Sequence, residues 1–490
     1  MTIRSASGQP TTLLTPAQMK QADEATGRLG VPIADLASAA ARAIVDEIVG
    51  DRGESGPVAV LVGGGFNGTD GRLAACLLRE RGIEVEVFAS VPENERERDL
   101  GQFRPERFAL VIDALLGAGL SRSVEGEIAE VIRRLNASRV EVLAVDLPSG
   151  IDGTTGAVRG VAVQARRTVT FERRKPGHLL LPGRDHCGRT VVRPIGLPSE
   201  ALAGLPKDLH ANEPVLWHEH LLTAARIGHK YDRGHAVVMS GGSAHTGAAR
   251  LAAGAALRGG AGLVTLLSPS SALLVNASHL TAIMLRRCED ETDLSPILEN
   301  ERFNAFVLGP GFGVGAKANA FVARIRQADR RLVLDADGIT SFRDDPASLF
   351  AMAQQQDKSP GIVLTPHEGE FSRLFPDLAK DAGSKIDRAR EAAQRSGAIV
   401  VLKGADTVIA SPDERAAVNA TGTAWLATAG TGDVLAGLVA AQLANGLPAF
   451  EAACAAVWIH GRASEMHGPG LISEDLPGLV PAVLRELFPG

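Results

Sequence analysis

Residues 425–438, WLATAGTGDVLAGL, place three glycines and one carboxylate at the start of an apolar helical pattern. Glycines let backbone N–H groups approach a ligand closely, and a turn into a helix N-terminus is an anion site. Asp433 either caps this helix or takes a proton from a hydroxyl that attacks a phosphoryl group. Because a cap would not require the glycines, the stretch favours phosphoryl transfer with Asp433 as the base.

Strand-like and helical patterns alternate along the chain in two series, which predicts parallel sheets covered by helices. A segment rich in proline and histidine, residues 198–225, separates the two series. We therefore predict two α/β domains, residues 1–212 and 213–490. The strand-like runs are 58–64, 83–89, 108–117 and 140–150 in the first series, and 235–242, 261–267, 304–311, 331–337, 361–370 and 398–404 in the second.

Composition excludes several classes of protein. The 490 residues are 45% hydrophobic and 22% charged, which is typical of a soluble globular chain. A net charge of −6 and 4% aromatic residues argue against a nucleic-acid partner. We find neither a signal-peptide core nor a long apolar run, so we expect no membrane partner and a cytoplasmic location. The four cysteines are far apart and are expected to be buried, reduced thiols: Cys76, Cys187, Cys288 and Cys454.

The first strand of the first series ends in GGGFNG at 63–68, which formally matches the dinucleotide fingerprint GxGxxG. The acidic residue expected after the next strand is missing, because that strand ends in Ala89 and Ser90. A hydride-transferring Rossmann enzyme is therefore the weaker alternative. A Walker A motif is not found after either glycine-rich stretch.

Polar side chains also follow other strands of the first series. Asn67, Asp113 and Ser149 offer hard oxygen ligands, which suit an alkali or alkaline-earth cation. The alternative is that each of them only closes a turn between strand and helix. Ligands bind at the carboxyl ends of strands in such sheets, so we expect the chemistry there.

Motifs in both halves resemble known families. TPAQMKQAD near the N-terminus, GGGFNGTDGRLAACLL, DALLGAGLSRSVEG, VDLPSGID and KPG at 175–177 resemble the NAD(P)H-hydrate epimerases. The stretch that begins HKYDRGH, with LGPGFG, LDADGI, LTPHEGEFSRL, VLKGADTVIA and ATAGTGDVLAG, resembles the ADP-dependent NAD(P)H-hydrate dehydratases of the ribokinase-like fold. The resemblance covers nearly the whole chain. It implies a Rossmann-like three-layer α/β sandwich followed by a ribokinase-like α/β domain.

The resemblance implies a repair reaction for the second domain. Water adds to the 5,6 double bond of reduced nicotinamide, and the dehydratases restore the S hydrate with ADP, which gives AMP and phosphate. Asp433 would activate the C6 hydroxyl, and magnesium would accompany ADP. The positions that would contact the hydrated nicotinamide are Ala248, Gly311, His367 and Asp433. The positions that would contact ADP are Lys403, Gly404, Ala405, Asp406, Thr407, Asn419, Gly430, Thr431 and Gly432. For His367, the alternative is a capping or core histidine.

For the first domain the resemblance implies epimerisation of the hydrates at C6, with Asp146 as the acid/base residue. Asn67, Asp113 and Ser149 match the potassium-binding positions of the family. The substrate-binding positions would be Phe66, Asn67, Gly68, Thr69, Asp70, Gly117, Gly119, Leu120, Ser121 and Asp146.

Three positions of the first domain depart from the pattern of that family. Phe66 stands in place of an asparagine, Thr69 in place of a glycine, and Ser38 in place of a glutamate. Phe66 cannot supply amide contacts, and we expect Thr69 to disfavour the positive φ that glycine permits. The two interpretations are an active, potassium-dependent epimerase, which we expect, and a non-catalytic structural domain.

Two alternatives concern the whole chain. A sugar or vitamin kinase of the ribokinase-like fold would share GTGD but release a phosphate ester, and such kinases lack TPHEGE and HKYDRGH in this form. A binding module would hold nicotinamide nucleotides without reacting. We expect the hydrates of NADH and NADPH and ADP as small-molecule partners, and a homo-oligomeric state.

Overall fold

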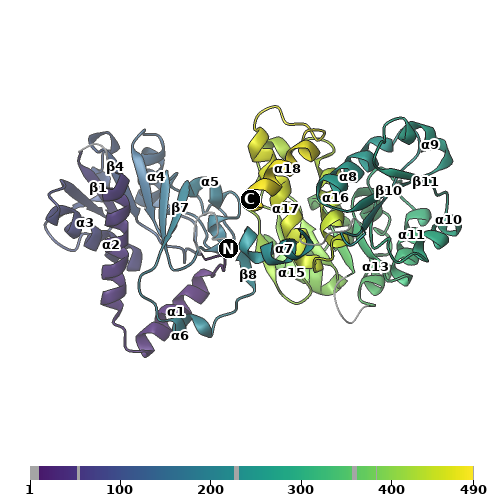
Figure 1. Ribbon diagram of the computed structural model, residues 1–490. Coiled ribbons are helices and arrows are strands. Elements are labelled where there is room, and N and C mark those ends of the chain that lie inside the picture. The colour runs from purple at the N-terminus through teal and green to yellow at the C-terminus, as the bar shows by residue number, and fades with distance from the viewer. Residues whose placement is uncertain (1–9, 52–55, 226–230, 356–360, 382, 489–490) are drawn as a thin grey trace. The chain divides into compact units, whose positions relative to one another are not determined.

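The computed structural model describes residues 10–51, 56–225, 231–355, 361–381 and 383–488 (Figure 1). Contacts divide the chain into two compact units, one of Thr12–Leu209 and one of Met1–Thr11 with His210–Gly490. The functional boundary after residue 212 stays a prediction. Among the described helices, none is long and apolar enough to span a membrane.

A parallel sheet forms the centre of the first unit (Figure 1, purple to teal). Within the described residues it has seven strands in the order β3-β2-β1-β4-β5-β6-β7. The strands are β1 (Val58–Val62), β2 (Val85–Ala89), β3 (Glu97–Asp99), β4 (Leu110–Ala114), β5 (Glu141–Val145), β6 (Arg167–Phe171) and β7 (Arg189–Arg193). The helices are α1 (Pro16–Arg28), α2 (Ile33–Asp51), α3 (Phe66–Glu80), α4 (Gly126–Asn136), α5 (Gly183–Cys187), α6 (Ser199–Ala203), and the short η1 (Leu100–Gln102), η2 (Pro105–Arg107) and η3 (Pro176–His178).

Both faces of this sheet are buried, because alternate side chains of β1 pack into two different apolar cores. Val58, Val60 and Val62 pack with residues of α2 and α3, whereas Ala59 and Leu61 pack with residues of α4. Successive side chains of a strand point to opposite faces, so helices cover the sheet on both sides. The expected three-layer α/β sandwich is confirmed.

The second unit is built on a larger sheet, which has ten strands within the described residues, in the order β11-β10-β9-β12-β13-β14-β15-β16-β17-β8. The pairings from β11 to β15 are parallel, and β15, β16 and β17 pair antiparallel. The strands are β8 (Leu209–Ala211), β9 (His235–Met239), β10 (Leu263–Ser268), β11 (Met284–Arg287), β12 (Ala305–Leu308), β13 (Arg331–Leu334), β14 (Ile362–Leu364), β15 (Ile399–Leu402), β16 (Val408–Ala410) and β17 (Ala416–Val418).

Helices surround this sheet. They are α7 (His218–Ala225), α8 (Thr246–Arg258), α9 (Ser270–Ala277), α10 (Glu291–Leu298), α11 (Ala316–Gln327), α12 (Ala336–Thr340), α13 (Pro346–Ala353), α14 (Glu368–Leu374), α15 (Lys385–Ser396), α16 (Thr431–Ala444), α17 (Ala449–His467), α18 (Leu476–Leu487), and the short η4 (Pro214–Leu216), η5 (Leu378–Lys380) and η6 (Ala424–Leu426). The α/β architecture expected for both domains is confirmed.

Helices α8 and α16 share one apolar core with β9, β10, β12 and β13. They approach closely because α16 carries Gly437, at which a Cβ would lie 2.0 Å from the Ala252 carbonyl oxygen. The N-terminus of α16 is thereby fixed relative to the sheet.

One prediction about the cysteines is wrong. All four are free, and Cys187, Cys288 and Cys454 are buried as expected, but Cys76 is exposed. Cys76 lies on α3, whose Ala74, Ala75 and Leu78 carry the buried face. Sequence alone gave no signal for the side of the helix on which the thiol lies.

Candidate functional site

The turn into α16 has the geometry of an anion site. Gly430 is the N-cap residue and has a left-handed backbone (φ 91°), which glycine adopts at little cost. The Thr431 hydroxyl donates to the carbonyls of Leu426 (2.9 Å) and Thr428 (3.1 Å), which fixes the loop before the helix. Asp433 is the third residue of the helix, so the interpretation of Asp433 as its N-cap is wrong.

Asp433 is half-buried at the mouth of this turn. Burial, with the negative charge of Asp335, raises the pKa of Asp433 to about 6, although Lys403 opposes the rise. A general base works best when its pKa lies near the working pH. The carboxylate is therefore ionised at neutral pH and basic enough to accept a proton.

Lys403 follows β15 and lies against the same turn. A Cβ on Gly432 would lie 3.3 Å from its Nζ. The ammonium donates to Asp335 Oδ1 (2.8 Å) and lies 3.9 Å from Glu370 Oε2. Burial disfavours the charge, but the carboxylates of Asp335 and Glu370 outweigh it and raise the pKa of Lys403. A permanent positive charge thus lies beside the backbone N–H groups of the turn.

The other positions predicted to contact ADP are the loop 404–407, which follows Lys403, and Asn419. Gly404 and Ala405 are exposed after β15, and the Asp406 carboxylate accepts from Lys385 Nζ (2.7 Å). The Thr407 hydroxyl donates to the Gly404 carbonyl (2.9 Å), which closes this loop.

Asn419 is buried away from solvent. Its Nδ2 donates to the Thr421 carbonyl (2.9 Å) and its Oδ1 accepts from Asn212 (3.0 Å). The side chain of Asn419 therefore supports the protein interior, and its contact with the nucleotide stays a prediction.

Two of the positions predicted for the hydrated nicotinamide lie together. Gly311 has a positive φ (62°), and a Cβ there would lie 3.5 Å from the Ala248 Cβ. The Gly311 carbonyl packs against Gly241, where a Cβ would be only 1.8 Å away. The glycine-rich ends of β9 and β12 therefore approach each other at the carboxyl edge of the sheet.

His367 is the N-cap of α14, as the alternative interpretation held. Its Nδ1 accepts from the backbone N–H groups of Gly369 (2.9 Å) and Glu370 (3.2 Å). Since Nδ1 accepts, the ring N–H lies on Nε2, which is 3.3 Å from Glu370 Oε1. The ring remains exposed, so a substrate contact by Nε2 stays a prediction.

Sequence analysis missed two carboxylates of this site, Asp335 and Glu370. Asp335 directly follows β13, is 2% exposed, and also accepts from the Thr365 hydroxyl (2.8 Å). Its position at the end of a buried strand is the same kind of signal that indicated Asp113. Glu370 could be found only through its contacts, because its sequence position is that of an ordinary capping-box residue.

Asp146 is the centre of the polar cluster in the first unit. It follows β5 with a positive φ (65°), and its Oδ1 accepts from Lys175 Nζ (2.5 Å) and the Thr170 hydroxyl (2.9 Å). Burial would raise the pKa of Asp146, but the Lys175 ammonium outweighs it and lowers the pKa. Sequence analysis did not assign a role to Lys175, which is 2% exposed and is marked in the sequence only by the KPG motif.

His178 supports the same residue. Its Nδ1 accepts from the Lys175 backbone N–H (2.9 Å), so its Nε2 donates to the Asp146 carbonyl (2.7 Å). Burial, together with the charge of Lys175, lowers the pKa of His178 to about 4. The neutral ring thus fixes the backbone that carries the Asp146 carboxylate.

Two further carboxylates face this cluster. Burial, then the charges of Asp146 and Asp23, raises the pKa of Asp70 to about 8. Asp23 lies on α1, which a hydrogen bond from the Leu14 N–H to the Arg174 carbonyl (3.1 Å) attaches next to Lys175. Burial raises the pKa of Asp23 to about 6, against the charge of Lys175. At neutral pH, Asp70 is protonated while Asp146 is ionised.

The three predicted potassium ligands are brought together. The fully buried Asp113 accepts from the Ser149 hydroxyl (2.6 Å) and backbone N–H (2.8 Å). The Ser149 hydroxyl accepts from the Leu116 N–H (2.9 Å), and Asn67 Nδ2 donates to the Leu116 carbonyl (3.1 Å). This set of hard oxygen atoms fits an alkali cation.

The substrate-binding positions predicted around α3 differ in exposure. Phe66, the first residue of α3, is 75% exposed. Gly68 is buried, and a Cβ there would lie 2.0 Å from the Gly63 carbonyl oxygen, so this glycine is required for close approach. The loop after β4 carries Gly117, Gly119, Leu120 and Ser121, of which Gly119 and Ser121 are exposed.

The expectation that the backbone at Thr69 needs a positive φ is wrong. Thr69 lies within α3 and is not among the residues with positive φ. Its N–H and hydroxyl both bond to the Gly65 carbonyl, at 3.0 and 3.3 Å. Ser38 is similarly helical and donates to the Ala34 carbonyl (2.8 Å). The departures at Thr69 and Ser38 therefore leave the backbone of the site undisturbed.

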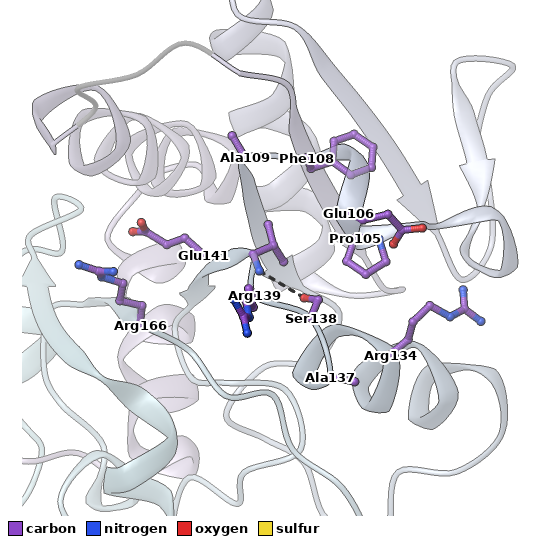
Figure 2. A pocket seen from close by; sticks show the side chains of 11 residues that line it. Pro105, Glu106, Phe108, Ala109, Arg134, Ala137, Ser138, Arg139, Glu141 and Arg166 are labelled. Atoms are coloured by element: carbon purple, nitrogen blue, oxygen red, sulfur yellow. Dashed lines mark hydrogen bonds between the residues drawn. The ribbon is translucent and has the colours of Figure 1, made fainter.

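A hollow of about 670 Å³ in the first unit is not part of this site (Figure 2). It is lined by Ala109, before β4, and by Glu141, at the start of β5, together with Arg134 and Arg166. These residues mark the amino ends of the strands, whereas Asp113 and Asp146 lie at the carboxyl ends. The hollow contains none of the predicted site residues.

Comparisons with known proteins match both units. The NAD(P)H-hydrate dehydratase family matches residues 236–469, and the YjeF-related protein N-terminus family matches residues 33–104 and 94–177. A solved NAD(P)H-hydrate dehydratase of Bacillus subtilis, described as ADP/ATP-dependent and co-crystallised with ATP and Mg²⁺, is 26% identical, with a TM-score of 0.45 over 55% of this chain and 97% of its own.

Several relatives match over most of this chain. The bifunctional NAD(P)H-hydrate repair enzyme of Thermofilum pendens is 34% identical and covers 88% of this chain and 87% of its own length. That of Mycobacterium leprae is 35% identical over 84% and 85%, and that of Gloeobacter violaceus is 36% identical over 93% of each. The chain belongs to the family of bifunctional NAD(P)H-hydrate repair enzymes.

Proposed function

We propose that the chain restores hydrated NADH and NADPH, with epimerisation of the R and S hydrates at C6 in the first domain and ADP-dependent dehydration of the S hydrate in the second. The observation that carries the dehydration is the Lys403 ammonium beside Gly432, in a turn that ends in Asp433. A cation and backbone N–H groups suit a phosphoryl group, and the adjacent carboxylate suits proton removal.

In the dehydration, the transferring phosphoryl group of ADP lies on the N–H groups of Gly430–Gly432, and Lys403 neutralises its charge. Asp433 takes the proton of the C6 hydroxyl as the oxygen of that hydroxyl attacks the terminal phosphorus of ADP. AMP then leaves. The ring nitrogen lone pair then expels phosphate from C6, and loss of a C5 proton restores the double bond. A magnesium ion bound to the ADP phosphates would supply further charge neutralisation.

For the epimerisation, we assign Asp70 as the acid and Asp146 as the base. The ring nitrogen assists breakage of the C6–O bond, and Asp70 gives its proton to the departing hydroxide. Water then adds to the opposite face of the planar carbon and gives a proton to Asp146, from which it returns to Asp70. Two carboxyl groups whose pKa values are driven apart are typical of such acid–base pairs.

Potassium belongs to the same proposal. Asn67, Asp113 and Ser149 would hold the ion together with the Leu116 carbonyl, and the charge of the ion would order the loops after β1, β4 and β5.

The expected cytoplasmic location and homo-oligomeric state stay predictions.

The test is the recovery of 340 nm absorbance when the protein receives hydrated NADH and ADP. The proposal requires recovery together with release of AMP and phosphate. A small-molecule kinase would form a stable phosphate ester and leave the absorbance unchanged, which would contradict the proposal. If the first domain is non-catalytic, the chain would restore only the S hydrate that is present and the S hydrate that forms spontaneously from the R hydrate.

A further inference from the structure

The residues KPGH at 175–178 place a buried histidine directly against the proposed base of the first unit. His178 belongs to the short η3 and is 2% exposed. Its Nε2 donates to the Asp146 carbonyl (2.7 Å), and its Nδ1 accepts from the Lys175 N–H (2.9 Å). One imidazole ring therefore bonds to the backbone of both members of the Asp146–Lys175 ion pair. The proton transfers assigned to Asp70 and Asp146 do not use this ring.

The backbone of Asp146 has a conformation that must be held. Its φ is 65°, in the left-handed region that residues other than glycine rarely adopt. The Asp146 N–H donates to the Val169 carbonyl (2.7 Å), and the Asp146 carbonyl accepts from His178. With the N–H fixed, a change in φ moves the side chain and the carbonyl group together. A bond at the carbonyl therefore also holds the carboxylate.

The carboxylate depends on that placement for its own contacts. Asp146 Oδ1 accepts from Lys175 Nζ (2.5 Å) and from the Thr170 hydroxyl (2.9 Å), and Lys175 Nζ also donates to that hydroxyl (3.0 Å). These three groups come from different segments, after β5, in β6 and before η3. A rotation of Asp146 would separate its carboxylate from both donors, and the charge of Lys175 would no longer compensate its burial.

The turn that carries His178 has attachments of its own. Pro176 begins η3 and favours the backbone of such a turn. At Gly177 a Cβ would lie 2.6 Å from the Asp152 carbonyl oxygen, so a larger residue would not fit. The Gly177 N–H donates to the Gly153 carbonyl (2.9 Å). His178 is therefore presented from a fixed support.

Packing alone does not account for a histidine at this position. An apolar side chain would fill the space without burying two ring nitrogens, which costs free energy unless both are bonded. Burial, together with the charge of Lys175, lowers the pKa of His178 to about 4, so the ring adds no charge beside the ion pair at neutral pH. What the histidine provides is two directed hydrogen bonds, one from each nitrogen.

We infer that His178 is a positioning residue for the epimerisation, which holds the Asp146 backbone so that the carboxylate stays paired with the Lys175 ammonium. The inference rests on the proposed function, in which Asp146 accepts a proton from the incoming water. His178 itself acts on the backbone of Asp146 and not on the proton. A reacting group that is held in one place before the reaction requires less reorganisation during it.

The test measures the recovery of 340 nm absorbance by variants of the full chain with pure R hydrate, ADP and potassium. His178→Leu removes both ring bonds, so kcat for the R hydrate should fall about 10- to 100-fold, while KM changes little. His178→Gln keeps an amide donor that reaches the Asp146 carbonyl and should recover most of the lost rate. His178→Asn is too short to reach that carbonyl and should remain slow.

His186→Leu is the matched control. His186 Nδ1 donates to the Val163 carbonyl (2.9 Å) in the same unit, and this carbonyl does not belong to a reacting residue. Both leucine variants should melt at a lower temperature than wild type, but only His178→Leu should lose kcat. Recovery from pure S hydrate, which the second unit catalyses, reports the amount of intact chain in each sample. Unchanged kcat in His178→Leu, equal losses of kcat in the two leucine variants, or a glutamine variant as slow as His178→Leu would each overturn the inference.

NMR decides the inference if His178→Leu does not fold. In the wild type, the ring nitrogen shifts of His178 should show the proton on Nε2, and a proton on Nδ1 would overturn the inference. The Asp146 N–H should exchange with solvent faster in His178→Asn than in His178→Gln. If the wild type repairs the S hydrate but not the R hydrate, the epimerisation fails as a function. The difference in exchange would then still support the placement of Asp146 by His178, and equal exchange would contradict it.

Discussion

Lys403 Nζ lies 2.8 Å from Asp335 Oδ1, and this ion pair places a cation beside the turn that carries Asp433. Asp335 is buried and also accepts from the Thr365 hydroxyl, so its orientation is fixed from a second side. The position of the Lys403 ammonium is therefore set by the protein before any phosphate binds, which reduces the reorganisation that phosphoryl transfer requires.

Replacing the proposed base should stop dehydration without removing the nucleotide. Asp433→Asn keeps the size of the side chain but cannot accept the hydroxyl proton, so we expect the rate to fall about 10²- to 10⁴-fold. Calorimetry should find ADP affinity largely unchanged, and 340 nm recovery measures the rate. Near-normal turnover in this variant would exclude Asp433 as the base.

Lys403 should matter for the nucleotide more than for the hydrate. Lys403→Ala removes a charge-assisted contact, so the apparent requirement for ADP should rise several-fold. Lys317→Ala, which removes a lysine that lies over the rings of Phe312 and Phe321, is the matched control. If ADP affinity stayed constant while hydrate affinity fell, the nucleotide would occupy the other side of the site.

The raised pKa of Asp433 has opposite consequences for activity and for stability. Activity requires the carboxylate, so kcat/KM should fall as the pH drops below about 6. Because the folded pKa exceeds the unfolded value, the ionised carboxylate destabilises the fold above about pH 6, and this penalty disappears below about pH 4. Asp433→Asn should therefore melt at a higher temperature than wild type at pH 8 and not at pH 4. Equal melting temperatures at both pH values would count against burial of the charge.

The first domain is tested with pure R hydrate and ADP. We expect recovery of NADH beyond the spontaneous rate of epimerisation, with a further increase on addition of potassium. Recovery should fall above about pH 8, where Asp70 loses its proton. Asp146→Ala and Asp70→Asn should each reduce recovery to the spontaneous rate while S-hydrate repair continues. Full epimerisation in Asp146→Ala would show that this carboxylate only closes its turn.

Phe66 and Thr69 can be tested separately, since the structure distinguishes them. Thr69→Gly should leave epimerisation unchanged and lower the melting temperature, because Thr69 is helical and glycine destabilises helices. Phe66→Asn restores an amide donor at the mouth of the site and should increase the epimerisation rate. An increase produced by Thr69→Gly alone would contradict the assigned conformation.

The sequence predicted the sheets, and it predicted the ends of the strands at which the sites lie. Buried parallel strands are continuous apolar runs, so a polar residue at the end of such a run, such as Asp113 near the end of β4, is conspicuous. Lys175 and Asp23 could not be found this way, because only the folded chain brings them to Asp146. The conformation of Thr69 was misjudged because a glycine in a motif was taken to require positive φ. In the structure that position is helical, and the nearby requirement for glycine is close packing at Gly68.

The contact between Gly437 and the Ala252 carbonyl limits how this chain can be engineered. Exchanging a helical glycine for alanine is a common route to thermostable variants, because it reduces the entropy of the unfolded chain. At Gly437 the added methyl group would push α16 away from α8 and carry Gly430, Thr431 and Asp433 with it. A change about one helical turn from Asp433 would thus lower the catalytic rate without touching a ligand, and any library aimed at thermostability should keep this position fixed.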